Sequence, residues 1–140
     1  MSVKGSIKTT VNQRAEFAYK CVRDIARDNA DIAKKYKAYS KRLMAMIRIN
    51  GLLATITFIK GKGSSLDAEG KAYKRLYKDI GEWLKSTDCP VNSVYDTNKR
   101  DLMDIVVSLN SDEYRVTTKE IMEFVNWLRR FAKGMIGDEN

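Results

Sequence analysis

The chain has 140 residues, a formal net charge of +8 at pH 7, two cysteines, one proline and no histidine. This length suits one domain, since domains commonly contain about 100–150 residues, and a hydrophobic fraction of 44% argues against disorder. Without histidine, Ser–His and Cys–His nucleophile pairs, His-ligated zinc and the H-E-x-x-H metalloprotease helix are excluded. We therefore expect a single domain over residues 1–140, in which only carboxylate-bound Mg²⁺ or a Lys-activated nucleophile remains open as catalytic chemistry.

Cys21 and Cys89 are far apart in the sequence and form no C-x-x-C motif, which favours two buried, reduced thiols over a disulfide or redox site. No apolar run approaches the roughly 18 residues of a membrane span. The first ten residues also lack the apolar centre of a signal peptide. These features predict a soluble, cytoplasmic protein that does not contact a membrane.

The positive charge is concentrated in one segment. Between Ile32 and Leu66 there are eight basic residues and no acidic one, so the rest of the chain carries equal numbers of the two signs. A basic segment of this kind indicates an anionic partner. The eight residues are Lys34, Lys35, Lys37, Lys41, Arg42, Arg48, Lys60 and Lys62.

Helical signals dominate the first half of the chain. Thr10 followed by Gln13 fits a capping box that begins a helix. The polar residues Asp28, Asn29 and Asp31 predict a boundary between this helix and a second one over residues 31–49. Asn50-Gly51 is typical of a helix end.

The second predicted helix has two contrasting faces at about 100° per residue. Its apolar face comprises Tyr36, Tyr39, Leu43, Met46, Ile47 and Asn50, and its basic face comprises Lys34, Lys37, Lys41 and Arg48. The segment offers the basic face no acidic residue at i,i+4, so its like charges repel one another unless a polyanion lies against them.

Residues 52–59 have strand-like composition, yet no second strand-like run exists to pair with them, so we expect a short buried helix. Residues 61–65 are the predicted loop. Ser64 with Asp67 indicates the start of the next helix, over residues 66–85. Its apolar positions are Tyr73, Leu76, Tyr77, Ile80, Trp83 and Leu84, and its basic positions are Lys71, Lys74, Lys78 and Lys85.

The last third begins with a long connection over residues 86–98, which contains Pro90, and continues with a short helix over 101–109. Thr117 with Glu120 fits a second capping box, which predicts the start of the final helix. Residues 1–9 and 134–140 are expected to be flexible ends. The predicted core positions of the final helix are Ile121, Phe124, Leu128, Phe131 and Met135. The elements together predict an all-α bundle of five to six helices.

Three other patterns have ordinary structural explanations. Gly61-Lys62-Gly63-Ser64 lacks the first glycine and the Lys-Ser/Thr step of a Walker loop. The carboxylate pairs Asp101/Asp104 and Glu120/Glu123 lie near predicted helix starts, where acids stabilise the helix dipole without any catalysis. The aromatic residues fall mostly in or beside apolar faces, which favours core packing over base stacking. The basic face of the second helix is better explained by sequence-independent binding to phosphates, because lysines attract phosphates but rarely read bases.

Several segments resemble, in order and spacing, the small "belly" subunit of the type III-B CRISPR effector complex. These are Lys35-Tyr36-Lys37-Ala38-Tyr39, Lys41-Arg42-Leu43, Asn50-Gly51-Leu52, Phe58-Ile59-Lys60, Ala72-Tyr73, Leu76-Tyr77, Trp83-Leu84, Glu113-Tyr114-Arg115, Thr118-Lys119-Glu120 and Asn126-Trp127-Leu128-Arg129-Arg130-Phe131-Ala132. The resemblance covers residues 14–132. Met44 stands where it leads us to expect a proline, so we expect an unkinked helix there.

The resemblance implies an all-helical, non-catalytic subunit that needs no cofactor or metal. It implies contacts with guide RNA and target RNA, with the backbone and other subunits of the complex, and with further copies of itself in a minor filament. The alternative is a helical DNA-binding or regulatory module. The residues expected to face RNA phosphates are Lys34, Lys37, Lys41, Arg42, Arg48, Lys60, Arg129 and Arg130.

Overall fold

The computed structural model describes residues 9–93 and 101–138, and its elements are all helical. Within these residues there are six α-helices and one 3₁₀ helix and no strand, which confirms the predicted all-α bundle. The helices are α1 (Thr10–Ala26), α2 (Ala30–Asn50), α3 (Leu52–Lys62), α4 (Ala68–Lys85), η1 (Pro90–Ser93), α5 (Leu102–Val107) and α6 (Ser111–Met135).

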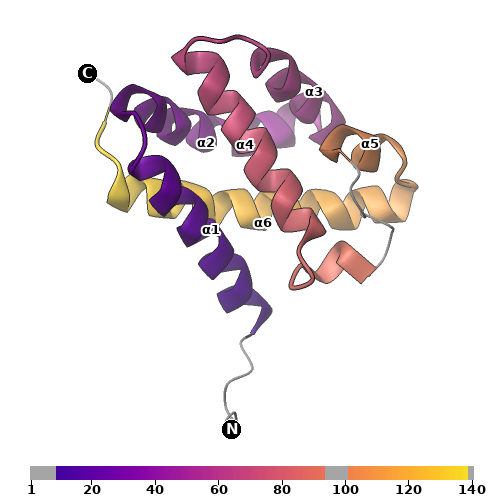
Figure 1. Cartoon of the computed structure of the whole chain (residues 1–140). Coiled ribbons are helices and arrows are strands. Elements are labelled where there is room, and N and C mark those ends of the chain that lie inside the picture. Colours follow the sequence, from indigo (N-terminus) through magenta and orange to yellow (C-terminus); the bar gives the residue numbers. More distant parts are fainter. Residues whose placement is uncertain (1–8, 94–100, 139–140) are drawn as a thin grey trace, which may run out of the picture.

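The longest helix, α6, extends across the whole molecule and is crossed by α1 and α4 (Figure 1). Helix α2 packs against both α4 and α6, while α3 packs against α4 and α5. As expected from Met44, α2 is one uninterrupted helix of 21 residues. The bundle therefore has α6 at its centre, in contact with α1, α2 and α4.

The helix starts lie close to the predicted ones, but the residues that cap α1 and α4 differ from those predicted. Thr9, not Thr10, caps α1, since its side chain accepts a hydrogen bond from the backbone N–H of Asn12. Asn29 caps α2 within the predicted boundary. Asp67 itself caps α4, where the sequence suggested Ser64. In each case the side-chain oxygen satisfies an N–H of the first turn, which has no partner within the helix.

Helix α3 confirms the predicted helix and extends beyond it. It continues through Gly61 to Lys62, so the first two residues of the predicted loop are helical. Gly51, between α2 and α3, has a φ of +87°, a conformation that favours glycine. This residue allows the chain to turn from α2 into α3 without an intervening loop.

The predicted start of α6 at Thr117 is wrong. The helix begins at Ser111, where Asn110 and Glu113 form a reciprocal capping box. Thr117 and Glu120 lie in the middle of the helix and are buried. The sequence contains two capping patterns, and the structure uses the first.

The C-terminal part of α6 differs in detail from the predicted pattern. The helix passes through Gly134 to Met135, and the next residue, Ile136, packs against the core. Met135 and, on α2, Asn50 are exposed although both were placed on apolar faces. Residues 1–8 and 139–140, in the ends expected to be flexible, lie outside the described residues.

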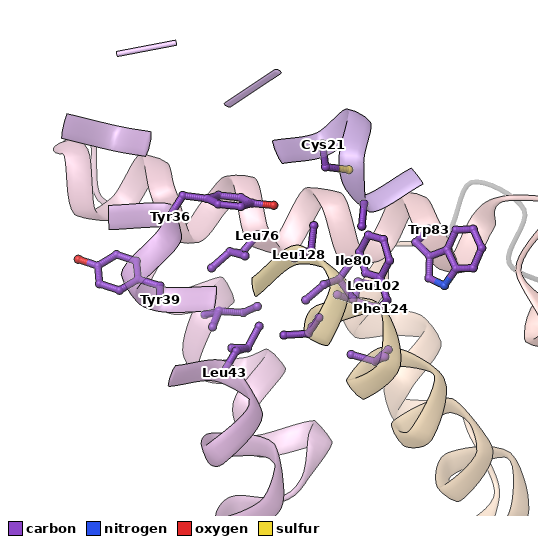
Figure 2. Packing of buried hydrophobic residues seen from close by; sticks show 14 of the residues in the cluster. Cys21, Tyr36, Tyr39, Leu43, Leu76, Ile80, Trp83, Leu102, Phe124 and Leu128 are labelled. Carbon is purple, nitrogen blue, oxygen red and sulfur yellow. The ribbon is translucent and has the colours of Figure 1, made fainter. Parts of the chain in front are cut away.

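The core is rich in aromatic side chains, as expected. Figure 2 shows Tyr36 and Tyr39 at one end of the cluster and Trp83 with Phe124 at the other. The rings of Trp83 and Phe124 stack at a centroid distance of 5.6 Å, and Tyr39 stacks on Tyr73 at 4.0 Å. These rings join α2 to α4 and α4 to α6.

A buried ion pair connects α1, α4 and α6. The Arg14 guanidinium donates two hydrogen bonds to the Glu120 carboxylate, at 2.6 and 2.8 Å, and the Trp83 indole N–H donates a third at 2.9 Å. Arg14 and Glu120 are 6% exposed. A charge buried to this extent is tolerated only when it is paired and hydrogen-bonded.

A second buried polar group lies between α2 and α4. The Tyr36 hydroxyl donates to the Asp79 carboxylate at 2.7 Å, and the Arg75 guanidinium lies 3.4 Å from the other carboxylate oxygen. Burial raises the pKa of Asp79, and this effect exceeds the lowering effects of the Tyr36 hydrogen bond and the Arg75 charge. Asp79 therefore binds a proton more tightly in the folded protein than in the unfolded one.

Replacing Glu120 by glutamine should destabilise the fold by about 3 kcal/mol, because Arg14 would keep its buried charge without its main partner. Urea denaturation measures this loss. Glu123→Gln is the matched control, because the Glu123 carboxylate also lies near Arg14, at 3.7 Å, but its side chain is 51% exposed. This substitution should lower the free energy of unfolding by about 1 kcal/mol or less. Equal losses in the two variants would contradict the structural role of Glu120.

Replacing Asp79 by asparagine should change how stability depends on pH. Because the folded-state pKa of Asp79 is raised above 3.8, its contribution to stability is greatest below about pH 4 and is lost as the pH rises through the folded-state pKa. The unfolding free energy of the variant relative to the wild type should therefore increase from pH 4 upward and then level off. Urea denaturation between about pH 4 and 8 tests this, and a constant or falling difference would contradict it.

Candidate nucleic-acid interface

The basic face of α2 lies opposite its buried face, as the sequence predicts. Tyr36, Leu43 and Ile47 are buried in the core. Lys41 and Arg48 are exposed, and Lys34 is half-buried. From Lys34 to Arg48 the face extends about 21 Å along the helix axis.

Helix α6 lies antiparallel to α2 along one edge of this basic face. At one end the Lys37 ammonium donates a hydrogen bond to the carbonyl of Ile136, directly after α6, at 2.8 Å. At the other end the Tyr114 hydroxyl, near the start of α6, accepts from the N–H of Leu53, just after α2, at 2.8 Å. Between these contacts Met44 of α2 and Met122 of α6 line a groove of about 570 Å³.

A second row of basic residues on α6 lies on the side of this groove. In a helical projection at about 100° per residue, four cations of α6 fall within a sector of roughly 80° around the helix axis. Met122 and Asn126 fall within the same sector. The row is about 27 Å long, and two of its members line the groove. These cations are Arg115, Lys119, Arg129 and Lys133. We call the basic face of α2 together with this row the α2–α6 face.

The sequence predicted only Arg129 in this second row. Arg115, Lys119 and Lys133 recur at helical spacing, but acidic residues of the same helix alternate with them in the sequence. The structure separates the two signs only in part: Glu120 points into the core, whereas Asp112 pairs with Arg115 at 3.0 Å and Glu123 lines the groove. A helical projection of residues 111–135 would have revealed the row.

Acidic residues from elsewhere in the fold neutralise half of the basic segment. Their carboxylate oxygens approach the ammonium nitrogens in the pairs Asp31–Lys35 (3.5 Å), Asp138–Lys37 (2.6 Å), Asp101–Lys60 (3.0 Å) and Glu69–Lys62 (3.8 Å). Among the described residues, no carboxylate lies within about 4 Å of the other four cations, which are Lys34, Lys41, Arg42 and Arg48. The expectation that the segment lacks acidic partners therefore holds for these four only.

Three predicted site residues lie over aromatic rings: Arg42 and Lys60 do so away from the α2–α6 face, and Arg130 does so at the edge of the α6 row, about 20° from Lys119 at 100° per residue. Arg42 lies over the Tyr39 ring, 5.4 Å from its centroid, on the α4 side of α2. Lys60 on α3 lies over the Tyr77 ring and pairs with Asp101. Arg130 lies over Trp127, 5.1 Å from the ring centroid. The α2–α6 face therefore brings together Lys34, Lys37, Lys41, Arg48 and Arg129 of the eight predicted residues.

The chain after α6 contacts the α2–α6 face directly. Asp138 is exposed, yet its carboxylate lies 2.6 Å from the Lys37 ammonium. The hydrogen bond from Lys37, the charge of Lys37 and the more distant charge of Lys41 lower the pKa of Asp138. Lys37 is thus already engaged within the chain, whereas Lys34 and Lys41 have no carboxylate this close among the described residues.

The groups considered for catalysis serve structural contacts. Asp101 accepts hydrogen bonds from Lys60 and from the Tyr77 hydroxyl, while Glu120 is buried against Arg14. Cys21 and Cys89 are both buried free thiols, and burial raises the pKa of Cys89 to about 12. Within the described ranges, no cluster of three or more cysteine or acidic side chains could hold a metal. No described helix is long and apolar enough to cross a bilayer.

The fold defines a small all-α helical protein, and the α2–α6 face is its candidate interface. The family model of "CRISPR-associated protein (Cas_Cmr5)" matches residues 10–135, and the chain belongs to this family. It is accordingly a subunit of a type III-B (Cmr) CRISPR complex, associated with the other subunits of that complex.

The fold is similar to one known from crystallography. The X-ray structure of a CRISPR-associated Cmr5 family protein from Thermus thermophilus matches this chain with a TM-score of 0.73 and 22% sequence identity. The match covers 93% of this chain and 100% of that protein. At this level of identity the match shows a common fold.

The contact between Lys37 and Asp138 predicts a titration that can be measured by NMR. The Asp138 carboxyl should titrate below its usual pKa of 3.8, and Lys37→Met should return it toward that value by removing both the hydrogen bond and the charge. Lys41→Met is the matched control and should cause a smaller change. An Asp138 pKa that is the same in the wild type and in Lys37→Met would contradict the contact.

Proposed function

We propose that this chain is a non-catalytic structural subunit that binds RNA backbones in a type III-B CRISPR ribonucleoprotein. Copies of the chain stack as a minor filament and help hold guide and target RNA for antiviral RNA interference. The α2–α6 face contacts the RNA phosphates, chiefly through Lys34, Lys41 and Arg48. Family membership supports the placement in the complex, and the observation that carries the RNA contact is the row of cations on α2 without neighbouring carboxylates among the described residues.

The chemistry of the α2–α6 face suits phosphates better than bases. Most of the cations on α2 are lysines, whose compact charge attracts phosphate without the fork geometry that arginine uses to read guanine. The two rows are about 21 and 27 Å long, so each can follow several phosphates of one strand. Trp83, Tyr36 and Tyr73 are buried, so they offer no exposed ring on which a base could stack. Binding should therefore depend weakly on RNA sequence and strongly on salt.

Lys34 and Lys41 are the best pair to test, because Lys37 also holds the chain after α6. Reversing both to glutamate removes two phosphate contacts per copy. At a salt slope of about 0.7 per contact for single strands, the assembled complex should bind RNA roughly 25-fold more weakly at about 0.1 M salt. The slope of log affinity against log salt should become shallower by about 1.4. Fluorescence anisotropy with a labelled single-stranded RNA measures both.

The matched control reverses two exposed lysines on other surfaces, Lys20 on α1 and Lys71 on α4. It makes the same change in net charge and should leave the affinity within about twofold of the wild type, since charges separated by more than about 10 Å are largely screened at about 0.1 M salt. If the Lys34/Lys41 variant kept both the affinity and the salt slope of the wild type, the α2–α6 face would not be the RNA-binding surface.

A further inference from the structure

The chain after α6 turns toward α2 and carries an acidic residue onto the α2–α6 face (Figure 1). Ile136 leaves the helix in an extended conformation, with φ −123° and ψ 135°. Its side chain is buried and packs against the core. Two residues further on, the Asp138 carboxylate reaches the Lys37 ammonium of α2. A buried anchor thus holds one carboxylate on the row of cations that we assign to RNA.

Lys37 makes two contacts with this segment, and they differ in strength. Its ammonium donates to the Ile136 carbonyl at 2.8 Å and to the Asp138 carboxylate at 2.6 Å. The Lys37 side chain is 18% exposed, whereas that of Asp138 is 85% exposed. Because water and salt screen an ion pair with so exposed a partner, it adds little to stability. Another anion can therefore replace the carboxylate while the Ile136 carbonyl still orients Lys37.

Asp138 meets the cation row of α2 between two of its members. Along the helix axis, Lys34 is about 4.5 Å and Lys41 about 6 Å from Lys37. The charge of Lys41 also contributes to the lowered pKa of Asp138. A strand that follows the row from Lys34 to Lys41 passes Lys37, where the carboxylate lies. A carboxylate and a phosphate both present anionic oxygens that accept from an ammonium group, so the two compete for the same donor.

We propose that Asp138 is a built-in competitor of RNA, whose carboxylate occupies Lys37 in the RNA-free chain and is displaced by a phosphate when RNA binds. The proposal rests on the proposed RNA contact of the α2–α6 face and adds Lys37 to that contact. Each copy must release its own carboxylate before Lys37 can bind a phosphate. The affinity for RNA is therefore reduced by the fraction of chains in which Lys37 is free.

The test introduces Asp138→Asn into the full chain of the assembled complex and measures RNA binding by fluorescence anisotropy. At about 0.1 M salt the affinity should rise about threefold, as expected when an exposed ion pair no longer competes with the ligand. The gain should shrink as the salt is raised, because salt also weakens the pair in the wild type. The matched control Glu82→Gln makes the same charge change and frees Lys78 of α4 from a carboxylate 3.9 Å away. It should leave the affinity within about 1.5-fold of the wild type.

A second background separates displacement from a general effect of charge. In Lys37→Met the carboxylate has lost its partner, so adding Asp138→Asn should change the affinity by less than about 1.5-fold. A gain of the same size in both backgrounds would make the effect one of net charge and would overturn the proposal.

An Asp138→Asn affinity equal to or below that of the wild type would overturn it as well. Failure of the RNA contact itself gives a different pattern. In that case the Lys34/Lys41 variant keeps the affinity and salt slope of the wild type. If only the competitor is wrong, the Lys34/Lys41 variant loses affinity, while Asp138→Asn binds RNA no better than Glu82→Gln.

Discussion

The buried carboxylate of Glu120 constrains the rest of the structure most strongly. It accepts hydrogen bonds from Arg14 of α1 and Trp83 of α4, and it belongs to α6, so one side chain fixes three helices relative to one another. It also sets the rotation of α6 about its axis. With Glu120 facing the core, Arg115 and Lys119 line the groove beside α2, and Lys133 falls on the same side of α6 at 100° per residue. The position of the second cation row thus depends on an interaction made in the core.

The distribution of charge in the folded protein differs from that in the sequence. Four of the eight cations between Ile32 and Leu66 pair with acidic residues from outside that segment. Cations without a neighbouring carboxylate among the described residues nevertheless remain on α2, and α6 contributes a second row that runs antiparallel to them.

Local patterns predicted the helices and their faces well. The separation of apolar and basic positions on α2 correctly placed Tyr36, Leu43 and Ile47 in the core, because helical period alone determines which residues share a face. Long-range contacts explain what the sequence could not predict. Thr117 and Glu120 satisfy a capping pattern, yet Glu120 is required by Arg14, which is 106 positions away. An acidic partner for Lys37 could not be predicted either, because that partner, Asp138, is 101 positions away in the sequence.

Cross-linking of RNA to protein in the assembled complex tests the central claim most directly. Ultraviolet cross-linking with labelled target or guide RNA, followed by mass spectrometry of the peptides of this chain, identifies the surface next to RNA. We expect the cross-links in α2 (30–50) and α6 (111–135), around Lys34, Lys41, Arg48 and Lys119. Cross-links confined to α4 would contradict the assignment of the α2–α6 face to RNA.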